Sequence, residues 1–283
     1  MSAQAPRVLL LGATGLLGGH LLARLPRSCQ TVAVSGRNGV TSADRGVEWL
    51  SMRMDAAAPA ALDSLLDMAG ADVIVNATGA SPRSEESTLD QVNARFPRAL
   101  AAAAATRGSR IVQISTDGVF SGARGNYAED DRPDPADAYG RSKLDGELAA
   151  PHLTIRTSFF GRSPRGTGLV EWLVGQRGQA VDGFADYRFT GIAASLLADL
   201  IASAIERALV GVYHVGGDPV TKYDLLRAVS QRLDLGVTVR PVSRGAVDRT
   251  LDSHTFFETA GRRRPTVAES IEALTPCGAL SRS

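Results

Sequence analysis

Tyr139 and Lys143 are the two side chains of this sequence whose types and spacing best suit proton transfer. Residues four apart on a helix share a face, so the phenol and the ammonium point the same way. A tyrosine has an unperturbed pKa of about 10. A nearby cation stabilises the phenolate and lowers that pKa, which makes proton exchange usable near neutral pH. Taken alone, the pattern equally describes a half-buried tyrosine beside a lysine that reaches solvent.

Thr116 offers a hydroxyl that can act with this pair. It follows the apolar run Arg110–Ser115, which predicts a strand, so Thr116 should lie at the carboxyl edge of a parallel sheet. Open α/β sheets bind their ligands at that edge. A hydroxyl there can hydrogen-bond a substrate carbonyl beside Tyr139, and the adjacent Asp117 is assigned to the same substrate site. A turn residue at a strand end is the alternative for Thr116 alone.

A glycine-rich turn near the start of the chain indicates a bound dinucleotide. Gly12, Gly15 and Gly18 are spaced Gly-x-x-Gly-x-x-Gly, between an apolar run and a helical one. The first glycine permits the tight turn, the second lets backbone N–H groups approach a pyrophosphate, and the third lets the helix pack on the strand. A turn without a ligand is the alternative, and a Walker A loop is excluded because no Gly-Lys-Ser/Thr occurs. The predicted cofactor-binding residues of the turn are Gly12, Thr14, Gly15, Leu16, Leu17 and Gly18.

Arg37 favours NADP(H) as the cofactor, with NAD(H) possible. A chain that binds NAD usually places Asp or Glu about 20 residues beyond the motif, on the adenosine ribose. No acid occurs here between Gly18 and Asp44. The guanidinium of Arg37 can instead pair with a 2′-phosphate, which a carboxylate would repel. Asp55 is predicted to accept from the adenine amino group; a solvated arginine and an ordinary surface aspartate are the alternatives for these two residues.

An α/β fold must position these residues. Short apolar runs alternate with longer helical segments, which implies βαβ units and a doubly wound parallel Rossmann sheet with helices on both faces. The predicted strands are Arg7–Leu11, Thr31–Ser35, Trp49–Met54, Ala71–Ala77, Arg110–Ser115, Leu153–Thr157, Gly211–Gly216 and Val237–Val242. The predicted helices are Leu16–Leu25, Pro59–Ala69, Leu89–Thr106, Tyr139–Ala149, Ser195–Leu209, Tyr223–Leu233 and Thr266–Leu274. Gly140 and Gly146 weaken their helix by about 1 kcal/mol each relative to Ala, which indicates close approach of its backbone to a neighbour or ligand.

Two parts are expected in the chain. Residues 1–160, joined by 192–217, should form the NADP-binding Rossmann domain. Residues 161–191 and 218–283 should form a smaller C-terminal substrate-binding lobe.

The composition bounds the remaining classes. The 283 residues are 44% hydrophobic and 22% charged, which excludes a disordered chain. Lys plus Arg (31) against Asp plus Glu (30) leaves +1, so charge gives no reason to expect nucleic acid or a membrane as partner. Two cysteines exclude a disulfide framework, and the four histidines show no metal-binding spacing. The first residues lack a signal-peptide pattern, so we expect a cytoplasmic protein.

The sequence resembles an extended short-chain dehydrogenase/reductase and, more narrowly, the dTDP-4-dehydrorhamnose reductase family. The matching segments cover most of the chain and are densest between Arg110 and Gly161. They are GATGLLG (12–18), VNATGA (75–80), VNA (92–94), STDGVFSG (115–122), YAEDDRPDPADAYGRSKLDGE (127–147), IRTSFFG (155–161) and GVYHVGG (211–217).

The resemblance implies an NADPH-dependent reductase that delivers hydride to C4 of a nucleotide-linked 4-keto-6-deoxy sugar. Tyr139 would be the general acid, Lys143 would hold the nicotinamide ribose and Thr116 would orient the carbonyl. The same resemblance assigns Ala77, Thr78 and Gly79 to the side of the cofactor, Asn93 to the support of the active site, and Phe159 to the sugar, with a core phenylalanine as the equal alternative.

Three departures from the family leave the sugar and the nucleotide open. Gly118 stands where relatives often carry Tyr, and the segments Asp182–Ile192 and Arg244–Asp252 follow the family pattern only loosely. Both segments would line the sugar-nucleotide pocket. Arg188 and Arg249 are assigned to the substrate site as pyrophosphate contacts, together with Arg244, and a surface arginine is the alternative for each.

Other functions of this fold stay open at this point. A nucleotide-sugar epimerase uses the same triad with tightly held NAD, and Arg37 argues against it. A 4,6-dehydratase usually carries Thr-Asp-Glu, whereas Gly118 follows Asp117 here. A non-catalytic, NADP-binding regulatory subunit is the alternative from another class, and the presence of both Tyr139 and Lys143 argues against it. A homodimer is possible.

Overall fold

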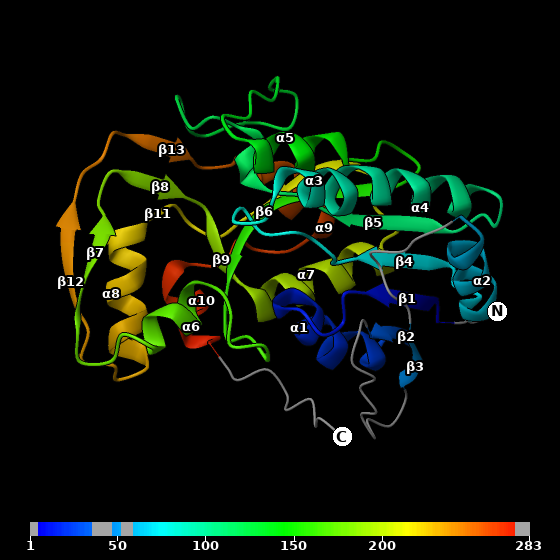
Figure 1. Cartoon of the computed structure of the whole chain (residues 1–283), viewed down its shortest axis with the longest axis horizontal. Coiled ribbons are helices and arrows are strands. Elements are labelled where there is room, and N and C mark those ends of the chain that lie inside the picture. The colour runs from blue at the N-terminus through cyan, green and yellow to red at the C-terminus, as the bar shows by residue number, and fades with distance from the viewer. Residues whose placement is uncertain (1–4, 36–46, 52–58, 275–283) are drawn as a thin grey trace.

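The computed structural model describes residues 5–35, 47–51 and 59–274. Its main sheet has the strand order β10-β6-β5-β4-β1-β2-β3, with β9 paired to β6, and each of these pairings is parallel. The predicted doubly wound parallel sheet is therefore confirmed (Figure 1). The strands are β1 (Arg7–Leu11), β2 (Gln30–Ser35), β3 (Val47–Ser51), β4 (Val73–Asn76), β5 (Arg110–Ile114), β6 (Leu153–Phe160), β9 (Gly191–Ala193) and β10 (Gly211–Val215).

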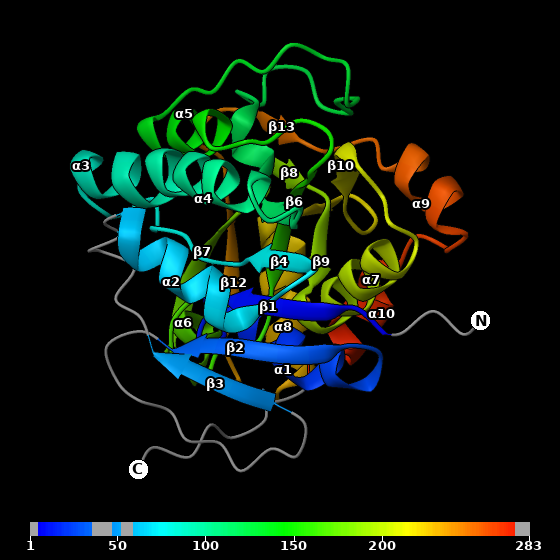
Figure 2. The ribbon, with the colours of Figure 1, turned by 90° about the vertical axis from the view of Figure 1, so that its right-hand side faces the viewer.

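Helices cover both faces of the sheet because the strands are apolar on both sides. In β1, Val8 and Leu10 point into one core and Leu9 and Leu11 into the other, as successive side chains of a strand must. The first core lies against α1 (Leu16–Arg24), α7 (Ala194–Glu206) and α9 (His254–Ala260), and the second against α2 (Pro59–Ala69) and α4 (Phe96–Ala105). Figure 2 shows α2 and α4 on one side of the strands and α7 on the other.

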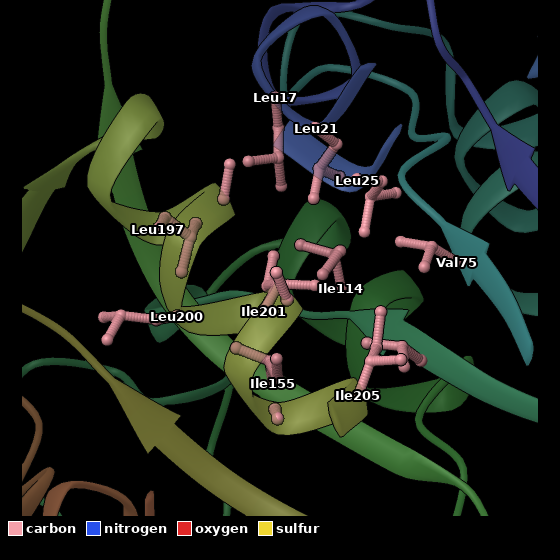
Figure 3. Packing of buried hydrophobic residues seen from close by; sticks show 14 of the residues in the cluster. Leu17, Leu21, Leu25, Val75, Ile114, Ile155, Leu197, Leu200, Ile201 and Ile205 are labelled. Atoms are coloured by element: carbon pink, nitrogen blue, oxygen red, sulfur yellow. The ribbon is translucent and has the colours of Figure 1, made fainter. Parts of the chain in front are cut away.

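The first core is a continuous packing of aliphatic side chains. Figure 3 shows Leu17 and Leu21 of α1 facing Leu197 and Ile201 of α7, and Ile114 of β5 belongs to the same cluster. All five side chains are at most 5% exposed. This packing fixes the glycine turn before α1 relative to the carboxyl end of β5.

The predicted helix Leu89–Thr106 is interrupted in the structure. It consists of α3 (Glu86–Leu89), a π-helical segment at Asp90–Arg95 and then α4. The N–H of Phe96 donates to the carbonyl of Gln91, five residues earlier. Pro97, which follows, has no N–H to give to the carbonyl of Asn93, as an α-helix would require. The wider turn is a feature often found at functional sites.

Residues after β6 build two small sheets beside the main one. The first has the order β11-β8-β13 and the second pairs β12 with β7. A separate apolar cluster packs them with α6, α8 and α10. These elements are α6 (Leu169–Val174), β7 (Ala180–Phe184), β8 (Tyr187–Phe189), β11 (Val220–Thr221), α8 (Lys222–Arg232), β12 (Thr238–Val242), β13 (Val247–Arg249) and α10 (Val267–Glu272). The division into a Rossmann domain and a substrate-binding lobe stays a prediction.

The sequence patterns placed most elements of the main sheet correctly and missed several short ones. The predicted strand Trp49–Met54 begins earlier, as β3, and residues 52–54 lie outside the described residues. No pattern predicted β7, β8, β13, α6 or α9, which are only three to seven residues long. Within the described ranges, no helix combines the length and apolarity needed to cross a bilayer.

Candidate active site

Thr116 lies two residues beyond the end of β5, at the carboxyl edge of the sheet as predicted. It caps a 3₁₀ helix of one turn, Asp117–Val119: its Oγ1 accepts from the N–H of Gly118 at 3.1 Å. The same hydroxyl donates to Oδ1 of Asp117 at 3.2 Å and is hydrogen-bonded to the phenol of Tyr139. Thr116 therefore holds together the two acidic groups nearest the sheet edge.

Tyr139 is presented by α5 (Ala138–Asp145), whose start is fixed from both sides. Asp137 is the N-cap, and its Oδ1 accepts from the N–H of Gly140 at 2.7 Å. A Cβ at Gly140 would lie 2.1 Å from the carbonyl oxygen of Gly118. The close approach predicted for Gly140 is thus confirmed, and it is what brings Tyr139 to Thr116.

Burial raises the pKa of Tyr139 to about 12. The hydrogen bond to Thr116 lowers the pKa, whereas the carboxylates of Asp117 and Asp137 raise it. The expectation that the ammonium of Lys143 lowers this pKa toward neutrality is wrong for this structure, because burial and two nearby carboxylates raise the pKa. Tyr139 therefore stays protonated at physiological pH.

Lys143 is buried under the sheet edge, 5% exposed. Its Nζ donates to the main-chain oxygen of Ile114, the last residue of β5, at 2.6 Å. Burial lowers the pKa of Lys143 to about 8, and the charge of Glu147 opposes that shift. The ammonium is thus anchored on the strand that ends beside Thr116.

A buried ion pair behind Lys143 was not found by the sequence analysis. Glu147 accepts from Nε and Nη2 of Arg156 at 2.9 and 2.8 Å, and from Oγ of Ser115 at 2.7 Å. The two charged side chains are only 10% and 6% exposed. Nη1 of Arg156 also lies 3.3 Å from Nε2 of the buried His214, whose pKa burial lowers to about 4. The neutral imidazole can accept there while its Nδ1, 3.0 Å from the carbonyl of Tyr127, donates.

Asn93 connects the helices around the site, as predicted for a supporting residue. From the π-helical segment, its Nδ2 donates to Oγ of Ser142 on α5 at 3.0 Å, and its Oδ1 accepts from the N–H of Ala80 at 2.9 Å. A Cβ at Gly146 would lie 1.8 Å from the carbonyl oxygen of Asn93, which confirms the second close approach. Asn93 therefore ties α5 to the segment that follows β4.

The glycine turn has the geometry expected of a cofactor cradle. Gly12 has φ +81°, and a Cβ there would lie 2.8 Å from the carbonyl oxygen of Ala77. A Cβ at Gly18 would lie 2.0 Å from the carbonyl oxygen of Gly12. Gly15 is the N-cap of α1, with no side-chain cap and no acidic residue in the first turn. The positive end of the helix is left open to an anion, so the turn fits a dinucleotide pyrophosphate.

The segment predicted to pass beside the cofactor lies against this turn. Ala77 follows β4 and its N–H donates to the oxygen of Leu11 at 3.1 Å. The hydroxyl of Thr78 donates to Oδ1 of Asn76 at 2.5 Å, and a Cβ at Gly79 would lie 3.6 Å from Oδ1 of Asn93. Arg37 and Asp55 lie outside the described residues, so their predicted roles stay predictions.

Across from Thr116, four side chains from four elements surround Asp117. Arg249 of β13 and Lys222 of α8 act on it as cations, and Ser158 of β6 hydrogen-bonds it. Burial nevertheless raises the pKa of Asp117 to about 6. Tyr187 of β8 is hydrogen-bonded to Arg249 and lies 3.6 Å, centroid to Nζ, beneath Lys222. Lys222 and Tyr187 were missed because only the three-dimensional fold brings their segments to Asp117.

The remaining predicted substrate residues lie in different surroundings. Arg249 is 15% exposed, and its Nη2 is 3.7 Å from Oδ2 of Asp137. Arg188 is 54% exposed and pairs with Asp248 at 3.1 Å. Phe159 is half-buried and packs against the core of the main sheet, and Arg244 lies over the ring of Phe184. Of the predicted arginines, the structure brings Arg249 to the cluster around Asp117.

The family model for the RmlD substrate binding domain matches residues 6–253. The chain belongs to this family. A dTDP-4-dehydrorhamnose reductase of Aggregatibacter actinomycetemcomitans is 30% identical over 243 residues, 79% of this chain and 78% of the relative. A dTDP-4-keto-6-deoxy-D-glucose reductase of Streptomyces niveus is 32% identical over 253 residues, 83% of this chain and 82% of the relative.

A solved structure shows the same fold. A dTDP-4-dehydrorhamnose reductase from Bacillus anthracis, in complex with NADP, superposes with a TM-score of 0.80 at 22% identity. The superposition covers 96% of this chain and 99% of the other. The resemblance to the dTDP-4-dehydrorhamnose reductase family and the prediction of a reductase of the short-chain dehydrogenase/reductase type are thus confirmed.

Proposed function

We propose that this RmlD-family protein is an NADPH-dependent reductase of a nucleotide-linked 4-keto-6-deoxy sugar. The observation that carries the proposal is the convergence of Thr116, Tyr139 and Lys143 where β5 ends. The two relatives named above are reductases of dTDP-4-keto sugars, and the B. anthracis structure contains NADP. The cytoplasmic location and a homodimer stay predictions.

The cofactor would be held by main-chain groups of the glycine turn, by the segment after β4 and by Lys143. When bound, NADPH supplies the hydride. Tyr139 holds a proton at Oη and gives it to the C4 oxygen as that oxygen gains negative charge. Thr116 orients the same oxygen with its hydroxyl, an electrostatic contribution that is largest where water is excluded. The cluster of Arg249, Lys222 and Asp117 would bind the sugar nucleotide from the opposite side.

The expected preference for NADP(H) favours reduction over epimerisation, because an epimerase of this fold holds NAD tightly and Arg37 is predicted to pair with a 2′-phosphate. The two relatives named above are also reductases. Burial and the neighbouring carboxylates raise the pKa of Tyr139 to about 12, and a protonated phenol is the form that completes a carbonyl reduction.

The test is the consumption of NADPH, with NADH alongside, against a set of nucleotide-linked 4-keto-6-deoxy sugars. Tyr139→Phe is expected to lower kcat by about 10²- to 10⁴-fold, the usual contribution of a general acid. The variant should bind NADP⁺ as tightly as the wild type, because it lacks only the hydroxyl. Unchanged turnover in Tyr139→Phe would show that another group donates the proton. Tight NADP⁺ binding without turnover on any sugar would favour the regulatory subunit.

A further inference from the structure

Arg165 reaches the glycine turn from a distant part of the sequence. It lies in the loop between β6 and α6, and its Nη2 donates to Oγ1 of Thr14. Thr14 is the residue before Gly15, the N-cap of α1. A cationic side chain is thus held beside the turn that would receive the cofactor.

The loop that carries Arg165 is held in place on both sides of it. The N–H of Arg165 donates to Oγ of Ser163 at 3.3 Å, and the N–H of Gly166 donates to the carbonyl of Ser163 at 3.1 Å. Gly166 and Gly168 have φ of +65° and +102°, a backbone conformation that residues other than glycine rarely adopt. A Cβ at Gly168 would lie 3.4 Å from Cδ1 of Leu16 at the start of α1. The loop therefore presents Arg165 to the turn by its own structure.

Two arginines of this loop differ in how their charge is balanced. Arg162 pairs with Glu171, at 2.7 Å from Nε to Oε1. Arg165 is exposed, and no carboxylate among residues 5–35, 47–51 and 59–274 pairs with it. Its neighbour is the N-terminus of α1, which carries a partial positive charge and has no acid in its first turn. Among the residues that the structure describes, no carboxylate compensates these two adjoining positive groups, an arrangement that an anion between them would stabilise.

We propose that Arg165 binds the pyrophosphate of the dinucleotide at the glycine turn. This inference rests on the proposed function, because it assigns a further residue to the cofactor site. A guanidinium can bind two phosphate oxygens at once, and its present partner is a neutral hydroxyl that a phosphate can replace. A diphosphate also occurs in the sugar nucleotide. The contact with Thr14 assigns Arg165 to the cofactor, whereas Arg249 and Lys222 lie on the substrate side.

Calorimetric titration of the purified, cofactor-free protein tests the assignment with NADP⁺, 2′-AMP and dTDP as separate ligands. In Arg165→Gln, the Kd for NADP⁺ should rise about ten- to a hundredfold, the usual effect of losing a charge-assisted contact. The Kd for 2′-AMP, which has no pyrophosphate, and the Kd for dTDP should stay within twofold of the wild type. The Kd of Arg165→Lys for NADP⁺ should lie between that of the wild type and that of Arg165→Gln, because lysine keeps the positive charge but lacks the planar guanidinium.

Arg240→Gln is the matched control, since it makes the same change of charge on β12, where Arg240 pairs with Asp182. It should leave all three affinities unchanged. A wild type that does not bind NADP⁺ would overturn the proposed function itself. A wild type that binds NADP⁺, with Arg165→Gln binding equally well, would overturn only the role of Arg165. A weakened dTDP affinity with NADP⁺ unaffected would also overturn it, by moving Arg165 to the substrate diphosphate.

Discussion

Nζ of Lys143 is 2.6 Å from the main-chain oxygen of Ile114, so the helix that carries Tyr139 is fastened to the strand that ends two residues before Thr116. This bond joins a cation to a neutral carbonyl inside the protein. Burial is therefore only partly compensated, and the pKa of Lys143 falls to about 8. The residue that we propose to hold the ribose therefore destabilises the fold.

Replacement of Lys143 by Met should abolish turnover and stabilise the protein near pH 7. The shift of the pKa from 10.5 to about 8 corresponds to about 3 kcal/mol, and loss of the bond to Ile114 returns about 1 kcal/mol. We therefore expect a net gain of about 2 kcal/mol in the free energy of unfolding.

The stability of the wild type should also depend on pH. Because the pKa of Lys143 is lowered on folding, the unfolded state binds more protons between pH 8 and 10.5, and wild-type stability rises across that window. Urea unfolding should show the advantage of Lys143→Met shrinking from pH 7 to pH 10. The same gap at both pH values would contradict this account, and Arg141→Met, an exposed neighbour, is the control.

Removal of the positive charge at position 156 should strongly destabilise the fold. The variant Arg156→Met leaves Glu147 buried without its partner, which typically costs about 3–5 kcal/mol. The double variant Arg156→Met/Glu147→Gln should recover part of that loss, since no unpaired charge remains. A double-mutant cycle by urea unfolding measures the difference. Additive single effects would mean that the two side chains do not depend on one another.

Gly146→Ala should disturb the site without touching a reacting group. Its Cβ would lie 1.8 Å from the carbonyl oxygen of Asn93, so α5 must move away from the π-helical segment. We expect a loss of at least about 2 kcal/mol in the free energy of unfolding, with a fall in kcat as Tyr139 shifts. Gly175→Ala is the control, because a Cβ there meets only oxygens of its own helix, the nearer at 3.3 Å. Equal thermal midpoints for the two variants would exclude the steric argument.

Arg249→Met should weaken binding of the sugar nucleotide more than binding of the cofactor. Arg249 lies next to Asp117 and Gly118 on the substrate side of the site, and a desolvated guanidinium contributes most when it pairs with an anion. We expect KM for the sugar nucleotide to rise about tenfold or more, with the Kd for NADP⁺ unchanged. Arg188→Gln should raise KM less, since Arg188 is paired with Asp248 at the surface. The reverse order would reassign the two arginines. Steady-state kinetics and calorimetry on the same preparations separate the two quantities.

The parts of the fold that the sequence predicts are those with long apolar patterns. β1, β4 and β5 are buried on both faces, so their sequences are nearly continuous apolar runs. The π-helical segment before Pro97 gave no such signal, because proline near the start of α4 is equally compatible with an ordinary helix. β8 and β13 are three residues long and have Arg188 and Asp248 at their centres, so their sequences resemble those of loops.

The candidate site divides in the same way. Tyr139, Lys143 and Thr116 were predicted because their spacing and their position after a strand are local properties. Arg249 was predicted as a substrate contact, but Lys222 and Tyr187 beside it were not, because residues far apart in the chain meet there only after folding. The high pKa of Tyr139 was missed for a related reason: it depends on burial and on Asp117, neither of which the Tyr-x-x-x-Lys spacing reports.

The order in which the strands are used has a consequence for how the molecule can be divided. The main sheet takes β1–β6, returns for β9 and β10, and its core is completed by α9, while β7, β8 and β11–β13 belong to the small sheets. No single cut in the chain separates the main sheet from the small ones. We therefore expect that, after proteolytic cleavage in the loop at 161–168, the two pieces would stay associated. A gene fragment ending after β6 would yield a protein with an open apolar sheet edge and a tendency to aggregate.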